Sequence, residues 1–201
     1  MTRKPTTTTS NSTFTTTPSR LTLFWLLVSL PLVIWDTLYV LLRPHTMPGG
    51  ALHYPLWAPY ELYGRVDYVY GWKAWNERNG FTAAQGMMNA VETVMYLVYA
   101  WGVLGGGNGK GEGRRGATVL LVGFSAAVMT LSKTVLYWLN EYYSGFDNIG
   151  HNSTFDLILL WIIPNGAWLV FPSVMIYTLG SEIIDGLAGP STTTDRSIKV
   201  E

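Results

Sequence analysis

Acidic and amide side chains inside apolar stretches are the residues of this chain best suited to chemistry. Asp36 lies in one long apolar run, Glu92 lies in a second, and Asn89 precedes Glu92 by about one helical turn. Burial in apolar surroundings disfavours the charged form of a carboxyl group, so one such group can donate a proton while another accepts it. These residue types therefore predict acid–base catalysis on a hydrophobic molecule.

The elements that must position these side chains are four apolar runs, at residues 21–42, 83–104, 117–139 and 155–176. About 20 apolar residues suffice to cross a bilayer as a helix. A charged side chain at that depth costs a few kcal/mol and therefore usually faces the protein interior. We expect an all-α, polytopic membrane protein, a bundle of four transmembrane helices over residues 21–184 with a polar pocket inside it.

Composition supports a membrane protein and excludes several other classes. Of the 201 residues, 48% are hydrophobic and 13% are charged, with a net charge of zero. The chain has no basic stripe, which argues against nucleic acid as a partner. It has no cysteine, so disulfides, thiolate chemistry and cysteine-ligated zinc are excluded. The chemistry expected at the acids needs no metal and no other cofactor.

The segments between and around the runs differ in character. Residues 1–20 are rich in Thr and Ser and are predicted to be a disordered tail, and residues 185–201 a flexible one. Residues 43–81 are dense in aromatic side chains, so we expect a structured cap between the first two helices. The Gly-rich segment 105–116 contains Lys110 without a following Ser or Thr, which favours a flexible turn over a phosphate-binding loop.

Basic residues predict the orientation in the membrane. Both tails and segment 105–116 carry Lys and Arg, and the remaining loop cations lie in segment 43–81. Cytoplasmic segments carry an excess of such residues, so we expect both termini in the cytosol. The glycosylation sequons at Asn11 and Asn152 are expected to stay unmodified, because the first lies on the cytosolic side and the second lies close to a span.

Each acid also has a structural interpretation. Glu92 shares a helical face with Gln85 and Asn89, a pattern that serves either a site or hydrogen bonding between helices. Asp36 lies past the middle of its span and could instead reach water at the interface. Lys133 could pair with an acid or extend its ammonium group to the membrane surface.

The fourth run contains two prolines, Pro164 and Pro172, which distort a helix and free backbone carbonyls. Asn165 and Trp168 are three residues apart and share one face beside the first proline. A kinked helix alone would explain the prolines, whereas an amide and an indole beside the kink favour a site.

At these residues the chain resembles the EXPERA-domain family, which includes a sterol Δ8–Δ7 isomerase and the sigma-2 receptor. The strongest similarity covers Val135–Phe146 (VLYWLNEYYSGF) and Asn165–Pro172 (NGAWLVFP). The segment Phe81–Thr93 is similar to the acid-bearing second helix of the isomerase. The resemblance extends over residues 23–180 and implies a four-helix protein of the endoplasmic reticulum with a sterol-sized pocket.

The resemblance also implies residue roles. Glu92 and Asp36 correspond to the acids of the second and first helices, and Asn165 with Trp168 to the pair in the fourth helix. These four are the candidate catalytic residues. Asp67 is similar to a loop aspartate of the sigma-2 branch. The further candidate ligand-binding residues lie on the matching helices: Asn89, Tyr96, Tyr137 and Glu141.

Two departures from the family pattern affect the expected reaction. The isomerase has a histidine one turn before its first-helix acid, where this chain has Leu32. A threonine three residues after the second-helix acid is replaced by Met95. Both departures concern the reaction and not the fold, and they leave open a substrate that is another isoprenoid or a secondary metabolite.

Three readings of function remain open. The first is an isomerase acting on a sterol-like lipid, in which Glu92 protonates an alkene, aromatic faces stabilise the cation, and Asp36 or Asp67 relays a proton. The second is a non-catalytic protein that binds or transports sterols or small amines. The third is a structural membrane protein whose acids serve helix packing. The bilayer and a sterol-like molecule are the expected partners, and a homodimer is left open.

Overall fold

The computed structural model describes residues 18–105 and 113–188, which contain helices and no strand. The longest elements are α1 (Arg20–Leu41), α4 (Phe81–Leu104) and α5 (Gly113–Tyr143). A fourth long segment joins three elements, α6 (Thr154–Asp156), the π-helix η1 (Leu157–Ile162) and α7 (Ile163–Ala188). All four segments are long and apolar enough to cross a membrane. The predicted all-α bundle of four transmembrane helices is confirmed.

Local sequence signals explain where the helices begin and end. Ser19 caps α1 by accepting a hydrogen bond from the Thr22 amide at 3.0 Å, and Ser153 caps α6 through the Asp156 amide at 3.1 Å. Such caps satisfy amides that have no partner within the helix. Gly145, at φ +68°, follows the end of α5 in the left-handed conformation typical of helix C-termini.

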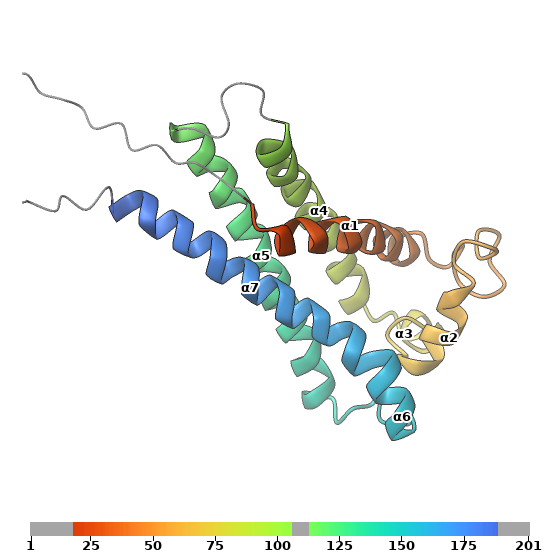
Figure 1. The fold of residues 1–201 in the computed structure, drawn as a ribbon. Coiled ribbons are helices and arrows are strands. Elements are labelled where there is room, and N and C mark those ends of the chain that lie inside the picture. Colours follow the sequence, from red (N-terminus) through yellow and green to blue (C-terminus); the bar gives the residue numbers. More distant parts are fainter. Residues whose placement is uncertain (1–17, 106–112, 189–201) are drawn as a thin grey trace, which may run out of the picture.

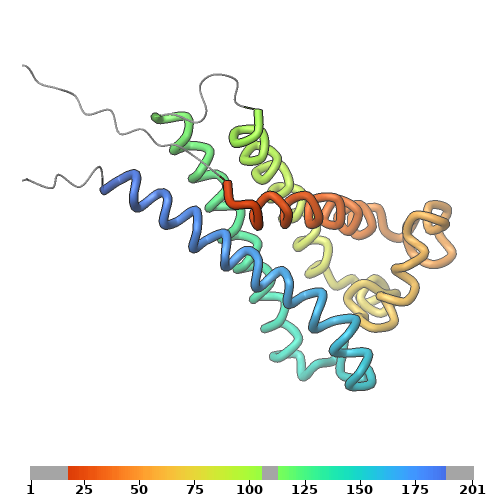
Figure 2. The backbone as a smooth tube through the Cα atoms, in the orientation of Figure 1, coloured from red at the N-terminus to blue at the C-terminus, as the bar shows by residue number. Residues whose placement is uncertain are grey.

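The helices pack in the order α1, α4, α5, α7, with the largest contact between α5 and α7 and only a light one between α1 and α7. Figure 1 shows that α1 and α7 diverge towards the end of the molecule that carries α2, α3 and α6. The backbone trace in Figure 2 shows that α4 ends and α5 begins at the opposite end of the molecule, where α1 also begins. The distance between α1 and α7 is therefore larger at the end that carries α2 and α3 (Figure 1).

The outer surface of the bundle is apolar. Leu27 is 74% exposed, Val94 59%, Leu121 56% and Ile163 58%, one on each membrane-spanning segment. Large apolar side chains on every outward face indicate contact with lipid hydrocarbon. The protein is an integral membrane protein.

The segment between α1 and α4 forms the structured cap expected from its aromatic content. It contains α2 (Pro59–Val66) and α3 (Trp72–Asn76). A buried cluster joins it to the end of α1: Tyr39, Val40, Met47, Trp57 and Tyr60. Burial of these side chains holds the cap against the end of α1.

Two helices are longer than the sequence predicted. α5 begins at Gly113, within the segment expected to be a flexible turn, and ends at Tyr143. α7 continues to Ala188, so residues 185–188 are helical where a flexible tail was expected. Hydropathy marks only the part of a helix that contacts lipid, whereas backbone hydrogen bonding continues through charged residues. The rest of both tails, residues 1–17 and 189–201, and segment 106–112 lie outside the described residues.

The Asn152 side chain is built into the fold. Its Nδ2 donates to the carbonyls of Val66 and Ile149, both at 2.7 Å. Glycosylation at this nitrogen would break both hydrogen bonds, which supports the expectation that this sequon is unused. Asn11 lies outside the described residues.

Candidate functional site

A cavity of about 450 Å³ lies between α1, α4, α5 and α7, beneath α2. This volume is in the usual range for small-molecule sites. Aromatic rings make up much of its wall: Trp35, Tyr60, Tyr63, Tyr70, Phe81, Tyr137 and Trp168. The divergence of α1 from α7, filled from one side by α2, creates the space.

Asp36 lines this cavity and is held as a hydrogen-bond acceptor. The Tyr60 hydroxyl of the cap donates to its Oδ1 at 2.6 Å, and Asn89 Nδ2 of α4 donates to its Oδ2 at 3.3 Å. Tyr60 remains a donor, because burial and the neighbouring Asp36 carboxylate raise the pKa of Tyr60 above its ordinary value. Asp36 is therefore oriented by one residue of the cap and one of the bundle.

The hydrogen bonds continue from Asn89 along the wall between α4 and α5. Lys133 Nζ donates to Asn89 Oδ1 and to Glu92 Oε2, the latter at 2.9 Å. We call the series Asp36, Asn89, Lys133 and Glu92 the polar chain. It links two carboxylates on neighbouring helices through one amide and one ammonium group, so Lys133 pairs with an acid as one of the two alternatives predicted.

Glu92, in contrast to Asp36, does not line the 450 Å³ cavity. It is 3% exposed, and its Oε2 accepts hydrogen bonds from both Lys133 and the Thr130 hydroxyl, at 2.9 and 2.8 Å. Tyr96 adds a contact of 3.1 Å to Thr130 and likewise lies away from the cavity. Proton exchange between Glu92 and a ligand would have to pass through Lys133, the one partner of Glu92 among the described residues that lines the cavity.

Asn165 and Trp168 both line the cavity from α7. Pro164 has no N–H to donate, and the turn before it is the wider π form, with the Ile163 amide donating to the Ile158 carbonyl. Asn165 Nδ2 donates to the Trp161 carbonyl at 2.9 Å and contacts the Tyr63 hydroxyl at 3.4 Å. The hydrogen bond to the Trp161 carbonyl in the π-helix therefore holds this amide at the cavity wall.

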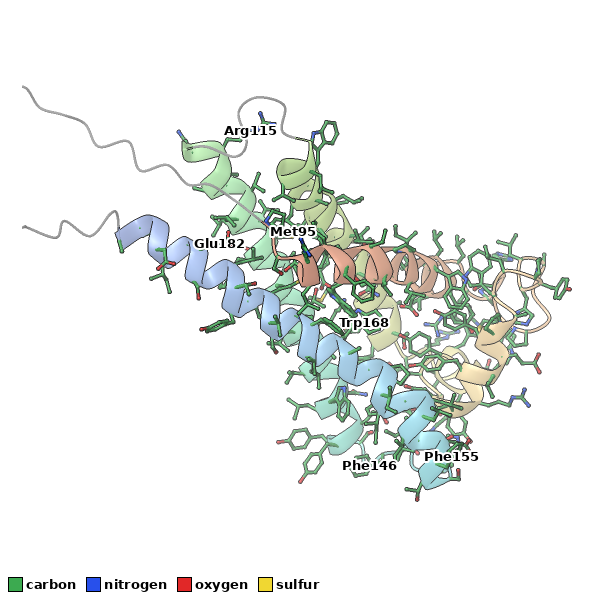
Figure 3. The ribbon with its side chains drawn as sticks, in the orientation of Figure 1. Met95, Arg115, Phe146, Phe155, Trp168 and Glu182 are labelled. Atoms are coloured by element: carbon green, nitrogen blue, oxygen red, sulfur yellow. The ribbon has the colours of Figure 1, made fainter. Side chains whose placement is uncertain are left out.

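The Trp168 ring extends from α7 towards α1, as Figure 3 shows. It meets the Trp25 ring edge to face, with centroids 5.0 Å apart. This contact joins α1 to α7 beside the cavity, which Trp168 lines and Trp25 does not. The indole thus forms one end of the ligand space.

Asp67 is fully buried in the cap and lies behind the cavity wall. Its carboxylate accepts hydrogen bonds from the Tyr137 hydroxyl, from Trp161 Nε1 at 2.8 Å and from the Val69 amide at 3.0 Å. Burial raises the pKa of Asp67 to about 6 in spite of these donors. Tyr137 lines the cavity, so Asp67 acts on that space only through Tyr137.

Glu141 also lies away from the cavity. It is 1% exposed, and its Oε1 accepts hydrogen bonds from Asn148 at 2.8 Å and Asn140 at 3.3 Å. These contacts tie the last turn of α5 to the connection before α6. Among the candidate ligand-binding residues, Asn89 and Tyr137 line the cavity, whereas Asp67, Tyr96 and Glu141 do not.

Sequence reasoning did not single out Tyr60 or Gln85, which both line the cavity. Tyr60 lies in a segment with many aromatic residues, and no local pattern distinguishes the one that meets Asp36. Gln85 donates to the Lys133 carbonyl at 3.3 Å, and its own buried Oε1 has no partner among the described residues. Its place in the amide stripe with Asn89 was the available signal.

Within residues 18–105 and 113–188, no cluster of three His, Asp or Glu side chains could hold a metal ion. Comparison of the chain with protein-family models, with curated proteins and with solved structures found no match. The geometry of the cavity and the polar chain is therefore the basis for a functional proposal.

Proposed function

We propose that this protein is a membrane isomerase that moves a double bond in a sterol-like or other polycyclic isoprenoid lipid by proton transfer. The observation that carries the proposal is the cavity between the membrane-spanning helices, which combines aromatic walls with Asp36 and Lys133. A hydrophobic ligand gains from the apolar wall, and a few placed polar groups supply orientation and chemistry. The resemblance to the EXPERA-domain family agrees with this assignment.

In this proposal Asp36 is the group that exchanges a proton with the ligand. It lines the cavity, and its two hydrogen bonds hold both oxygen atoms in place. General acid–base catalysis requires the reacting group to lie within hydrogen-bond reach of the proton it moves. Glu92, the acid first expected from the sequence, contributes through Lys133, since it does not line the cavity.

The test of this function is complementation of a yeast strain that lacks its sterol Δ8–Δ7 isomerase, combined with sterol profiling. The expected result is restored Δ7 sterols with the wild-type chain and accumulated Δ8 sterols with Asp36→Asn. Incubation of the purified protein with other polycyclic isoprenoid olefins extends the test beyond sterols. Unchanged double-bond positions in every substrate would contradict an isomerase.

A second candidate function is binding of a small amine without catalysis. Its support is the set of rings beside the Asp36 carboxylate, including Trp35, Tyr60 and Tyr63, because aromatic faces and an anion together attract ammonium groups. Asp36→Asn would then weaken amine binding strongly. Formation of an isomerised product that requires Asp36 would contradict binding without catalysis.

We place the protein in the endoplasmic reticulum with both termini in the cytosol. The resemblance to the EXPERA-domain family supports the endoplasmic reticulum, and the excess of Lys and Arg in the tails and in the segment that joins α4 to α5 supports the orientation. A glycosylation reporter fused after Glu201 is expected to stay unmodified. Efficient modification there would reverse the orientation.

A further inference from the structure

Two charged side chains line the 450 Å³ cavity among the described residues, Asp36 and Lys133. They belong to different helices, α1 and α5, and Asn89 of α4 contacts both. A hydrophobic ligand in this cavity therefore meets one potential proton acceptor and one cation on the same wall. The chemistry of the site must be compatible with both.

Asp36 is arranged as a base. Tyr60 and Asn89 donate to its two oxygen atoms, and hydrogen bonds donated to a carboxyl group favour the carboxylate. Direct protonation of an isolated alkene requires a strong acid at the ligand. The carboxyl that was expected to supply it, Glu92, is paired with Lys133 and does not line the cavity.

Lys133 is arranged as a cation with a donor to spare. An ammonium group has three N–H donors, and the described residues provide two acceptors, Asn89 Oδ1 and Glu92 Oε2. The Glu92 carboxylate at 2.9 Å stabilises the charged form. The third N–H can bind an oxygen atom of a ligand.

A cation on the wall opposes a carbocation in the cavity and stabilises an anion there. We propose, building on the function above, that the substrate carries a carbonyl group next to the migrating double bond, and that Lys133 binds the carbonyl oxygen. The substrate class is a β,γ-unsaturated ketone of a polycyclic lipid. The reaction proceeds through an enolate.

The proton and electron balance of this route closes without a co-reactant. The Asp36 carboxylate removes the proton between the carbonyl and the double bond, and the electron pair of that C–H bond forms the enolate. Lys133 donates a hydrogen bond to the enolate oxygen. The protonated Asp36 then returns the proton to the far carbon of the former double bond, which leaves a conjugated ketone and the original carboxylate.

The experiment compares two probes on the full chain in lipid nanodiscs. One probe is cholest-5-en-3-one, which becomes a conjugated enone when its double bond moves, and the other is a Δ8 sterol without a ketone. The expected result is faster isomerisation of the ketone than of the Δ8 sterol. Removal of one oxyanion donor costs about 10²–10³-fold in rate, so Lys133→Met should slow ketone isomerisation by that factor.

Further variants keep the proposal testable if Lys133→Met alone unfolds. The double variant Lys133→Met with Glu92→Gln removes both charges of the pair and should show the same loss of rate. Lys73→Met removes a lysine of the cap that does not line the cavity and should leave the rate unchanged. In the wild-type chain, a saturated steroid ketone should inhibit isomerisation more strongly than the matching hydrocarbon does. The double variant should lose this difference between the two inhibitors.

The outcomes separate this inference from the proposed function. Isomerisation of the Δ8 sterol by the wild-type chain at the same rate as the ketone, or faster, would overturn the carbonyl route and leave the isomerase function in place. Ketone isomerisation that survives loss of Lys133 would overturn the role of Lys133. Failure of the wild-type chain to isomerise either probe would overturn both proposals for steroid substrates.

Discussion

The two ends of the polar chain differ in what surrounds them. At Asp36, a carboxylate meets a cavity of about 450 Å³ and takes hydrogen bonds from a tyrosine and an amide. At Glu92, a carboxylate is enclosed between helices and paired with an ammonium group at 2.9 Å. Both acids belong to membrane-spanning helices, yet only the first can touch a ligand.

This difference shows that burial of a charge and availability for chemistry are separate properties. Glu92 has its charge compensated by Lys133 and Thr130, which is the usual condition for an ionised group inside a protein. Asp36 has donors but no cation within salt-bridge distance among the described residues. Asp36, at the open end of the polar chain, is therefore suited to proton exchange with a ligand. Glu92, at the sealed end, is suited to stabilising the charged form of Lys133.

The largest expected effect is on turnover at the open end. Asp36→Asn keeps the shape of the side chain but removes the proton acceptor, so isomerisation should fall by about 10²–10⁴-fold. Ligand affinity should change much less. The matched variant Glu92→Gln should cause a smaller fall, because it keeps an acceptor for Lys133 and Thr130. A larger loss of turnover in Glu92→Gln than in Asp36→Asn would reverse the comparison.

The next effect is on stability at the sealed end. Lys133→Met leaves the Glu92 carboxylate buried without its counter-charge, which should lower the free energy of unfolding by about 3–5 kcal/mol. Adding Glu92→Gln to the same variant should recover most of that loss. Denaturant unfolding in detergent micelles measures both variants, and equal stabilities of the single and double variants would show that the pair is not a buried charge pair.

Asp67 extends the comparison to a buried carboxyl outside the membrane-spanning segments. Burial raises its pKa to about 6, from 3.8 in the unfolded chain, so the folded protein binds this proton more tightly. The resulting stabilisation is fully present below pH 3.8 and is lost as the pH rises through 6. This contribution to the free energy of unfolding amounts to about 3 kcal/mol. Unfolding measured across this pH range should show the dependence, and Asp67→Asn should flatten it.

The smallest effect is expected at an ion pair between the cap and the connection before α6. Lys73 Nζ lies 2.5 Å from Asp147 Oδ2, but the Asp147 side chain is 66% exposed. Exposed pairs contribute about 0–1 kcal/mol, so Lys73→Ala should change the free energy of unfolding by no more than that. A loss comparable to that of Lys133→Met would mean that exposure does not distinguish the two ion pairs.

The architecture could be predicted from the sequence because membrane insertion depends on local composition. Each span contains about 20 apolar residues, which predicts a transmembrane helix, and the aromatic content of segment 43–81 predicted a structured cap. The helix ends were less predictable. Gly113–Gly116 and residues 185–188 are helical although their composition suggested flexible segments.

The sequence by itself determined which side chains had to face the protein interior, since Asp36, Glu92, Lys133 and Asn165 each interrupt an apolar run. Only the tertiary structure decided which of them face one cavity. Tyr60 reaches Asp36 across 24 positions of sequence, and Lys133 reaches Glu92 across 41. Such contacts depend on how α1 diverges from α7 and how α2 fills the space, which no local pattern encodes. Hydropathy predicts the depth of a residue in the membrane, whereas only the packing of the helices determines the direction in which its side chain points.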